Sequence, residues 1–463
     1  MFLRITTLLA LSVASLLAAE NNLKWTALPD LPGGLGVAGP FVGVHNDALI
    51  IGGGANFPDG VPWRPTAGGG VSAKVYHDTI HVVTRDGDGY SIAEAKAKLP
   101  RTLGYGISVP TADGVLCIGG EWREGGVTHR SAKVFALSYA NGKITIAENY
   151  PPLPKSTTAA AGALIGNTIY ITGGDSGQGA TLNFWSLDLA KRDAEEFEWK
   201  ELTPWNGPAR THLLAASQND GSADCLYIFS GRMKDSKGQW HMLSDAHKYN
   251  PKSGKWKKVS DIQAKEDTQP RCVMAGTTTS VGTNSLLLFG GADGKRFITL
   301  ESLSAQIAAA KAAGNQQAAA DLNVEKQKIQ DAHDGFSRDI LLYNTVTDQW
   351  QKFADFEESS RSATAPGATE RVPIGSHVTT TAVQWGNSII IPTGESSPGI
   401  RTKNIWKIDL AKQNKRFGTT NWIVLVAYMG VLVGIGVYFS RKNNSAEDFF
   451  VAGKRVVWWA AGL

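Results

Sequence analysis

Short apolar runs that end in a pair of small residues recur along the chain. The second residue of each pair is glycine, and the first is Gly, Ser or Thr. The copies are ALIIGGG (48–54), VLCIGG (115–120), IYITGG (169–174), LYIFSG (226–231), LLLFGG (286–291) and IIIPTG (389–394). Runs this short, bounded by glycine, are typical of buried strands, so the pattern predicts a repeated β unit.

The spacing of the copies indicates the size of that unit. Measured at the second residue of each pair, the intervals are 67, 54, 57, 60 and 103 residues. A period in the fifties is typical of kelch repeats, in which each repeat folds into one four-stranded blade. The predicted fold class is therefore all-β, a six-bladed kelch-type β-propeller over residues 23–412.

A further strand follows each copy, and several repeats then reach a tryptophan that marks an outer strand, as at Trp199, Trp256 and Trp350. The last repeat ends at IWKIDL (405–410) without an outer strand, whereas the segment 25–28 is a strand without a repeat. Pairing the segment 25–28 with 404–410 would close the ring and leave no open sheet edge.

The long interval has its own explanation. Residues 296–338 are rich in Ala, Gln and Lys, which favour helix, and they have no strand character. We predict a helical insertion in blade five. A disordered linker is the alternative, because Gly314 and Asn315 interrupt the segment.

Both ends of the chain read as membrane-related segments. Residues 1–19 have a basic residue, an apolar stretch and small residues, which predicts a signal peptide. Residues 422–439 form an uncharged run that would extend ~27 Å as a helix, enough for a transmembrane helix. A buried core helix is the alternative. Basic residues follow this run, so we expect an inner membrane-anchored protein whose propeller lies in the periplasm.

Charge and cysteine usage exclude other classes. The formal net charge is +4 and no long Lys/Arg block occurs, so a nucleic-acid partner is not expected. The cysteines Cys117, Cys225 and Cys272 lie singly in apolar runs without metal-ligand spacing. We expect small buried core residues there, and neither a metal site nor a cofactor.

In a propeller, the loop before the first strand and the loop after the second strand of each blade meet on one face. The polar residues of these loops are therefore expected around a central mouth: Arg101, Glu121, Arg123, Asp175, Arg210, His212, Arg232, Arg271, His377, Glu395 and Arg401. So many arginines favour an anionic, hydroxyl-rich ligand, although each one could instead tie neighbouring loops together. The predicted substrate-binding residues are Arg101, Glu121, Arg210, Arg232, Arg271 and His377.

The loop from Gly394 to Thr402 is the most distinctive local feature. It places Glu395 and Arg401 on either side of a Pro-Gly turn. The segment resembles the Gly-Glu-x-x-Pro-Gly-(Leu/Ile)-Arg-Thr loop of the N-acetylneuraminate epimerase (sialic acid mutarotase) family. The resemblance implies that Glu395 is the proton acceptor and Arg401 a substrate contact, which together form the catalytic pair.

Further matches extend the resemblance to the whole predicted propeller. They are the segment 36–39 with Asn46 and Asp47, the pair Tyr105-Gly106, the segment 119–121, and HKYNPKSGKW (247–256). The blades that follow the Glu395 loop in the founding enzymes come first here, which resembles a circularly permuted branch of the family. The segment 55–70 departs from the family pattern, so the identity of the sugar stays open.

A second resemblance begins near residue 421. The segments 438–441 and 445–454 with Trp458 and Trp459 resemble the opening of sodium:solute symporters. This implies that residues 440–463 are the truncated start of a symporter domain, with any sodium site beyond residue 463.

The two resemblances together imply a function. We expect a mutarotase that interconverts the α and β anomers of N-acetylneuraminate or a related acidic sugar outside the cytoplasm, coupled to uptake by the fused symporter. One alternative is a non-catalytic sugar-capture domain of the transporter. Another is a protein-interaction kelch module, since propellers host many functions.

Overall fold

The computed structural model describes residues 23–66, 68–87, 89–356, 376–410 and 419–442. The chain divides into two units, Met1–Leu410 and Ala411–Leu463, which are treated separately. The predicted signal peptide and residues 443–463 of the predicted symporter segment lie outside the described residues.

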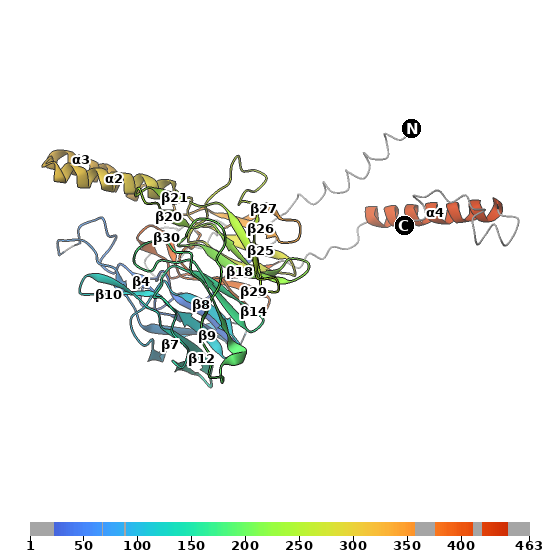
Figure 1. Ribbon diagram of the computed structural model, residues 1–463, viewed down its shortest axis with the longest axis horizontal. Helices are drawn as coiled ribbons and strands as arrows, with labels where there is room; N and C mark the ends of the chain where they lie inside the picture. Colours follow the sequence, from blue (N-terminus) through green and yellow to red (C-terminus); the bar gives the residue numbers. More distant parts are fainter. Residues whose placement is uncertain (1–22, 67, 88, 357–375, 411–418, 443–463) are drawn as a thin grey trace. The chain divides into compact units, whose positions relative to one another are not determined.

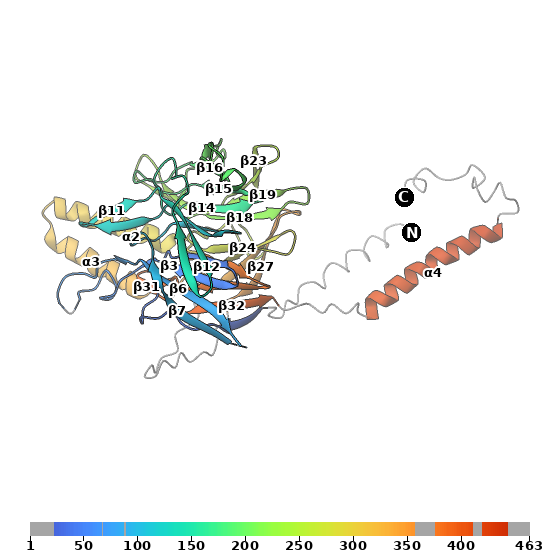
Figure 2. The same ribbon diagram turned by 90° about the horizontal axis from the view of Figure 1, so that it is seen from below.

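The first unit is a ring of four-stranded antiparallel sheets (Figures 1 and 2), and the described residues form six of them. This confirms the predicted six-bladed, all-β propeller. Blade one consists of β2 (Phe41–His45), β3 (Ala48–Gly52), β6 (Thr79–Asp86) and β7 (Gly89–Lys98), and blade two of β8 (Ile107–Thr111), β9 (Gly114–Ile118), β12 (Val134–Ala140) and β13 (Lys143–Ala147). Blade three consists of β14 (Ala161–Ile165), β15 (Thr168–Thr172), β16 (Phe184–Asp188) and β17 (Lys200–Glu201), and blade four of β18 (Leu214–Asn219), β19 (Asp224–Phe229), β22 (Ala246–Asn250) and β23 (Lys255–Val259). Blade five consists of β24 (Thr277–Val281), β25 (Ser285–Phe289), β26 (Asp339–Asn344) and β27 (Gln349–Asp355), and blade six of β28 (Val383–Trp385), β29 (Ser388–Pro392), β32 (Ile405–Leu410) and β1 (Leu23–Ala27).

The sixth blade combines the two ends of the propeller sequence. Strand β1 pairs antiparallel with β32, with Trp25 opposite Ile408. The Trp25 ring also packs against Phe356 of blade five, with ring centroids 5.0 Å apart. The predicted ring closure is thus present, and it leaves the outer edge of β32 paired.

A closed circle of backbone hydrogen bonds surrounds the central axis. One residue of each blade has a positive φ between 49° and 65°, and its N–H donates to the equivalent carbonyl of the preceding blade at 2.6–2.9 Å. The members are Gly39, Tyr105, Ala159, His212, Ala275 and Thr379. This left-handed conformation is uncommon for residues other than glycine, so the circle imposes a local constraint on the first strand of every blade.

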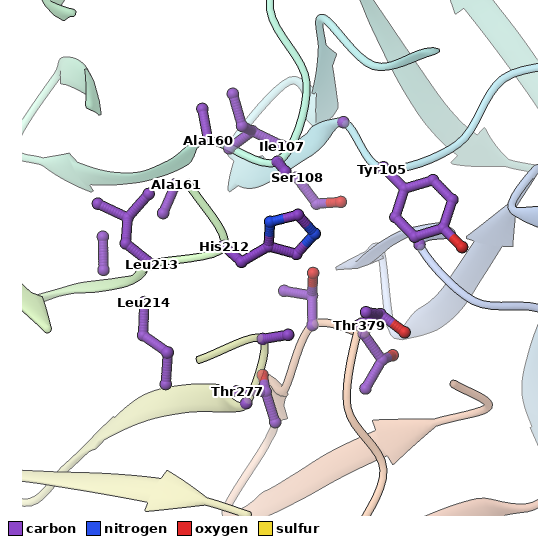
Figure 3. A pocket seen from close by; sticks show the side chains of 18 of the residues that line it. Tyr105, Ile107, Ser108, Ala160, Ala161, His212, Leu213, Leu214, Thr277 and Thr379 are labelled. Carbon is purple, nitrogen blue, oxygen red and sulfur yellow. The ribbon is translucent and has the colours of Figure 1, made fainter. Parts of the chain in front are cut away.

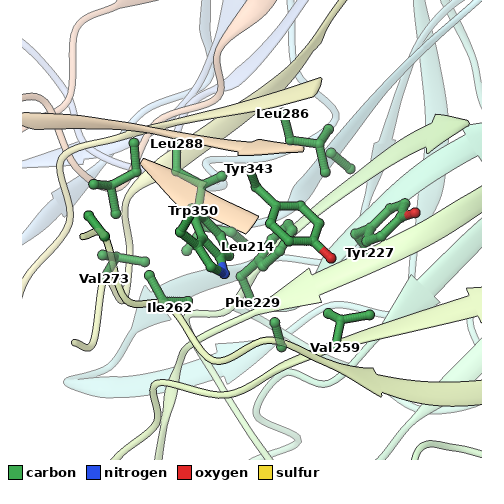
Figure 4. Close-up of a cluster of buried hydrophobic side chains, with 14 of the residues drawn as sticks. Leu214, Tyr227, Phe229, Val259, Ile262, Val273, Leu286, Leu288, Tyr343 and Trp350 are labelled. Atoms are coloured by element: carbon green, nitrogen blue, oxygen red, sulfur yellow. The ribbon is translucent and has the colours of Figure 1, made fainter. Parts of the chain in front are cut away.

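The hydrophobic core is divided among the contacts between neighbouring blades, and the described residues form one buried cluster at each contact. Figure 4 shows the cluster between blades four and five, where Phe229, Tyr343 and Trp350 pack together. The three cysteines are buried and free, as predicted. Because both faces of each blade are covered, the second strands are continuously apolar.

The outer tryptophans connect consecutive blades. The indole Nε1 of Trp199 donates to the Pro151 carbonyl at 2.9 Å. The Trp350 indole likewise donates to the Ser260 carbonyl at 3.0 Å. Each bond joins an outer strand to the loop that ends the preceding blade, which explains why tryptophan marks this position.

Small hairpins extend from blades one, two, four and six after their second strands. They are β4 (Ala55–Asn56) with β5 (Val75–Tyr76), β10 (Glu121–Glu124) with β11 (Val127–Arg130), β20 (Arg232–Lys234) with β21 (Trp240–Met242), and β30 (Glu395–Ser397) with β31 (Ile400–Arg401).

Blade five carries a helical hairpin at the equivalent place. It consists of α2 (Lys295–Ala312) and α3 (Gln316–Asp331), so the predicted insertion is helical. Gly314 at φ 74° makes the turn, and the Asn315 side chain caps α3 by accepting from the Ala318 N–H at 3.0 Å. Gly314 and Asn315, which made a disordered linker the alternative prediction, therefore form the connection between the two helices.

The second unit contains the helix α4 (Thr419–Lys442), which includes the predicted transmembrane segment. Among the described residues, no helix meets the length and apolarity required of a membrane span.

Candidate functional site

The polar residues of the mouth take their positions from an equivalent bridge in each blade. The residue after each small pair forms an isolated antiparallel bridge with the residue that precedes the axial circle, as Glu395 does with Val378. The six residues placed in this way are Ala55, Glu121, Asp175, Arg232, Ala292 and Glu395. Residues as far apart in sequence as Ala55 and Glu395 therefore occupy equivalent places around one opening.

The axial circle provides the floor of this opening. Its larger side chains are Tyr105, His212 and Thr379, and Figure 3 shows them around one pocket. His212 is half-buried, and its Nδ1 lies 3.2 Å from the Thr211 hydroxyl. Burial, reinforced by the charges of Arg232 and Lys74, holds the pKa of His212 well below its ordinary value, so the imidazole is neutral at neutral pH.

Glu395 is held tightly on its hairpin. Its Oε1 accepts two hydrogen bonds, one from Arg401 Nη1 at 2.9 Å and one from the Gly399 N–H at 2.9 Å. The hairpin register pairs Glu395 with Arg401, which places the two side chains together. Oε2 of Glu395 receives no donor from the described residues. One carboxylate oxygen is thus fixed, and the other remains available to a ligand.

Arg401 has further contacts that limit its freedom. Only 4% of its side chain is exposed. Its Nη2 lies 3.3 Å from the Tyr105 hydroxyl, and its guanidinium carbon lies 4.8 Å from the centre of the Phe57 ring. Because Nη1 and Nη2 both have protein partners, although Nε has none, the geometry of Arg401 suits the orientation of Glu395 better than direct contact with substrate.

A second acidic group lies across the mouth. The Tyr76 hydroxyl donates to Glu121 Oε1 at 2.5 Å, and burial together with the Glu121 charge raises the pKa of Tyr76. The Tyr76 and Tyr105 rings meet edge to face at 6.3 Å, and Lys74 Nζ lies 4.8 Å from the centre of the Tyr105 ring. Tyr76 and Lys74 were not predicted from the sequence. They lie just before the third strand of blade one, and that position could have indicated a place near the mouth.

A cavity of about 900 Å³ opens beside this network, between blades four, five and six. Glu395, Arg232, Arg271 and His212 line it, together with Phe297 of α2. This volume lies within the usual range for small-molecule sites. The cavity therefore contains the acid of the most distinctive loop and two of the predicted substrate-binding arginines.

The end of the helical insertion contacts Trp63 and Arg64 beside the Glu395 hairpin. Asp331, at the end of α3, pairs with Arg64 and accepts from Trp63 Nε1 at 3.0 Å. A Cβ on Gly399 would lie 2.7 Å from the Trp63 ring, so Trp63 packs directly on the turn of the Glu395 hairpin. The segment 55–70 and the insertion thus meet each other over the Glu395 hairpin.

Two of the predicted substrate-binding residues lie inside the protein. Arg210 has no exposed surface; it donates to Asp245 Oδ2 at 2.7 Å and to the Ser230 carbonyl at 3.0 Å. His377 is also buried, and burial lowers its pKa to about 4. Neither residue lines the cavity. The structure therefore places both apart from the cavity, and a role for either in binding substrate stays a prediction.

Two other predicted contacts are engaged elsewhere. Arg101 lies on the exposed rim, 3.6 Å above the centre of the Trp122 ring, and outside the cavity lining. Arg271 lines the cavity, but Asp267 and Asp339 both pair with its guanidinium. Equivalent positions around the mouth, one in each of three blades, are occupied by Glu121, Arg232 and Glu395. The prediction depended on this arrangement. No three His, Cys, Asp or Glu side chains of the described residues are placed to hold a metal ion.

Known proteins share this architecture. The fold is similar to the solved structure of YjhT, with a TM-score of 0.54 over 84% of this chain and 98% of that chain. The two sequences are 13% identical, so this likeness concerns the fold alone.

Curated relatives called N-acetylneuraminate epimerase are similar in sequence. The protein from Haemophilus influenzae (strain PittEE) is 28% identical over 257 residues, which is 55% of this chain and 58% of the relative. Those from Pasteurella multocida (strain Pm70) and Escherichia coli (strain K12) are 29% and 27% identical, over 50% and 58% of this chain and 55% and 62% of the relatives. The chain therefore spans little more than half the length of the curated relatives that it matches.

The family model of N-acetylneuraminate epimerase matches residues 150–453. The match covers more than half of the chain and contains the hairpin of Glu395 and Arg401. On this evidence the chain belongs to the N-acetylneuraminate epimerase family.

Proposed function

We propose that this protein is a mutarotase that interconverts the α and β anomers of N-acetylneuraminate. The observation that carries the proposal is the state of Glu395. Its Oε1 is fixed by Arg401 and the Gly399 N–H, its Oε2 has no donor among the described residues, and the residue lines a cavity of about 900 Å³. A positioned carboxylate of this kind suits a general base.

The reaction requires only proton transfers. Glu395 takes the proton of the anomeric hydroxyl, the bond between the anomeric carbon and the ring oxygen breaks, and the ring oxygen takes up a proton. The open-chain ketone then rotates, and the ring recloses on the other face with the proton transfers reversed. No oxidant, reductant or co-reactant is consumed, so the reaction balances with the groups of the cavity and water.

Arg401 acts through Glu395 in this mechanism. Its bond to Oε1 fixes the rotation of the carboxylate, so that Oε2 is presented to the substrate at a constant angle. Holding a base in its productive orientation lowers the entropy lost on reaching the transition state. Arg401 is accordingly a positioning residue.

Exchange between anomers of the dissolved sugar tests the proposal. A single anomer of N-acetylneuraminate is dissolved with the purified full chain, and proton NMR follows its equilibration. The Glu395→Gln variant is expected to bind the sugar but to lose roughly 10²–10⁴ in rate. Glu148→Gln is the matched control, because Glu148 forms an exposed ion pair with Lys133.

The outcomes separate the candidate functions. If Glu395→Gln equilibrates the anomers as fast as the unmodified protein, the catalytic assignment is wrong. If the unmodified protein binds the sugar without accelerating its equilibration, it is a capture domain instead.

The cellular setting is a further part of the proposal. We place the propeller in the periplasm, anchored through α4 and followed by a sodium:solute symporter that takes up the preferred anomer. The signal-like residues 1–19 and the basic residues after Phe439 support this arrangement. A reporter fused after Lys454 is expected to be active only in the cytoplasm, and activity only in the periplasm would contradict the arrangement.

The order of the blades is also proposed to be circularly permuted relative to the founding enzymes. Moving the chain break changes only which blade contains both ends, and here blade six joins β1 to β32. The partial sequence coverage of the relatives supports this proposal.

A further inference from the structure

The arginines near the mouth are almost all neutralised by nearby acids. Arg130 pairs with Asp175 at 3.2 Å, and Arg296 pairs with Asp334 at 3.0 Å. Arg401 and Arg271 have carboxylate partners as described above. These side chains have no need of a ligand to satisfy their charge.

Arg232 differs from them. Among the described residues, no carboxylate lies within 4.0 Å of its guanidinium, and no hydrogen bond engages its side chain. Its Nε is buried without a hydrogen-bond partner, as are those of Arg130 and Arg401, so the missing carboxylate is what distinguishes Arg232. The guanidinium carbon lies 4.2 Å from the centre of the Phe297 ring and 5.2 Å from that of Trp240. The half-buried charge thus lies beside two aromatic rings at the cavity wall without a carboxylate partner.

The nearest acids are turned to other groups. Glu301 accepts from Trp240 Nε1 at 3.1 Å, and Glu395 is bound to Arg401. Burial consequently lowers the pKa of Arg232, and the distant charge of Glu301 opposes this only in part. A half-buried charge without a carboxylate partner loses part of its hydration without compensation, so its contacts within the fold do not account for it.

The position of Arg232 supplies that reason. It occupies the blade-four place in the mouth that Glu395 occupies in blade six, and both residues line the same cavity. We propose that Arg232 is the group that binds the carboxylate of the substrate. Trp240 and Phe297 act as walls that hold the guanidinium fork in one plane. This assignment rests on the proposed function and replaces Arg401 as the substrate contact.

The chemistry of the sugar agrees with this placement. In N-acetylneuraminate the carboxylate is attached directly to the anomeric carbon. An anchor at Arg232 therefore brings the anomeric hydroxyl into the cavity that Glu395 lines. Phe297 belongs to α2, and Figure 1 shows α2 beside the β20–β21 hairpin that contains Arg232 and Trp240. The insertion of blade five thus contributes a wall of the substrate site.

Binding of two matched ligands tests the assignment. Calorimetry on the full chain compares N-acetylneuraminate with its carboxylate methyl ester, which keeps the sugar but removes the charge. The unmodified protein is expected to bind the acid roughly 10- to 100-fold more tightly, the usual worth of hydrogen bonds to a charged group. Equal affinity for acid and ester would overturn the proposal without any variant.

Variants locate the effect. Arg232→Met is expected to remove the preference for the acid while leaving the affinity for the ester unchanged, and Arg232→Lys to keep only part of it, because lysine cannot form the bidentate fork. Arg192→Met is the control, since Arg192 lies 4.7 Å from the centre of the Tyr150 ring on the outside of blade three and pairs with Asp113. An acid preference that persists in both Arg232 variants would show that another residue binds the carboxylate.

The same experiment separates this inference from the proposed function. Tight, Arg232-dependent binding of the acid without faster equilibration of its anomers would retain the carboxylate site and reject the mutarotase. Faster equilibration that does not depend on Arg232 would retain the mutarotase and reject Arg232 as the carboxylate site.

Discussion

Replacing Asp245 by Asn is expected to destabilise the propeller without changing how it handles its sugar. Asp245 Oδ2 accepts from the fully buried Arg210 at 2.7 Å and contacts His247 Nε2 at 2.8 Å. Asparagine keeps the shape of the side chain but removes its charge. The amide oxygen can still accept a hydrogen bond, but the buried guanidinium of Arg210 would lose its counter-charge, and its other acceptor, the Ser230 carbonyl, is neutral.

The size of the effect follows from this burial. Leaving one partner of a buried ion pair unpaired costs about 3–5 kcal/mol. The propeller has about 390 residues, so its unfolding entropy is about 0.8 kcal/mol per kelvin near the melting temperature. The expected decrease in Tm is therefore about 4–6 °C.

Thermal unfolding monitored by circular dichroism measures this decrease. Asp113→Asn is the matched control, because Asp113 pairs with Arg192 at the surface with 60% of its side chain exposed. A surface pair contributes about 0–1 kcal/mol, which corresponds to about 1 °C at most. Adding Arg210→Met to Asp245→Asn is expected to recover most of the loss, since it removes the unpaired charge.

The pH dependence gives an independent check. Burial alone would raise the pKa of Asp245, but hydrogen bonds from His247 and Arg210 outweigh it and hold the pKa below its ordinary value. The pair therefore contributes its full stability above the unfolded pKa of about 3.9 and loses it as the pH falls below that value. The Tm difference between Asp245→Asn and the unmodified protein should be constant from about pH 8 to 5 and shrink below about pH 4.

One result would refute the structural role of Arg210. If Asp245→Asn shifted Tm no more than Asp113→Asn but weakened sugar binding several-fold, Arg210 would have to reach the ligand.

Three further predictions concern the Glu395 hairpin and the ring. Gly399→Ala should lower the rate at least tenfold with little change in Tm, because its Cβ would meet the Trp63 ring at 2.7 Å and φ is 76° there; an unchanged rate would show that the turn tolerates displacement. Arg401→Lys should lower kcat more than it raises KM, because it disturbs the base rather than the substrate; a pure KM effect would restore Arg401 as a substrate contact. Starting the chain at Pro32 should lower Tm by several degrees relative to a chain that starts at Asn21, because strand β1 is lost; equal Tm values would contradict the closure of blade six.

The fold could be predicted almost completely from local patterns. A second strand such as β19 or β25 is covered by neighbouring blades on both faces, so its apolar run is continuous and easily detected. The closure of blade six was also predicted, because the last repeat lacked an outer strand and the N-terminal strand β1 had no repeat of its own. Two-residue strands such as β4 and β5 could not be predicted, because they depend on pairing with each other across about twenty residues and not on their own sequence.

The site was predicted less completely, and the arginines show why. Arg210, Arg232 and Arg271 all occur in blade loops of similar composition, and the sequence assigns them one common role. Their actual roles depend on acids distant in sequence: Asp245 is 35 residues from Arg210, and Asp339 is 68 residues from Arg271. For Arg232 no described acid takes that place. The local sequence therefore predicts where the charges gather, and only the tertiary contacts separate Arg210 and Arg271, which have carboxylate partners, from Arg232, which has none among the described residues. That separation makes the comparison of acid and ester at Arg232 the most direct test of the site.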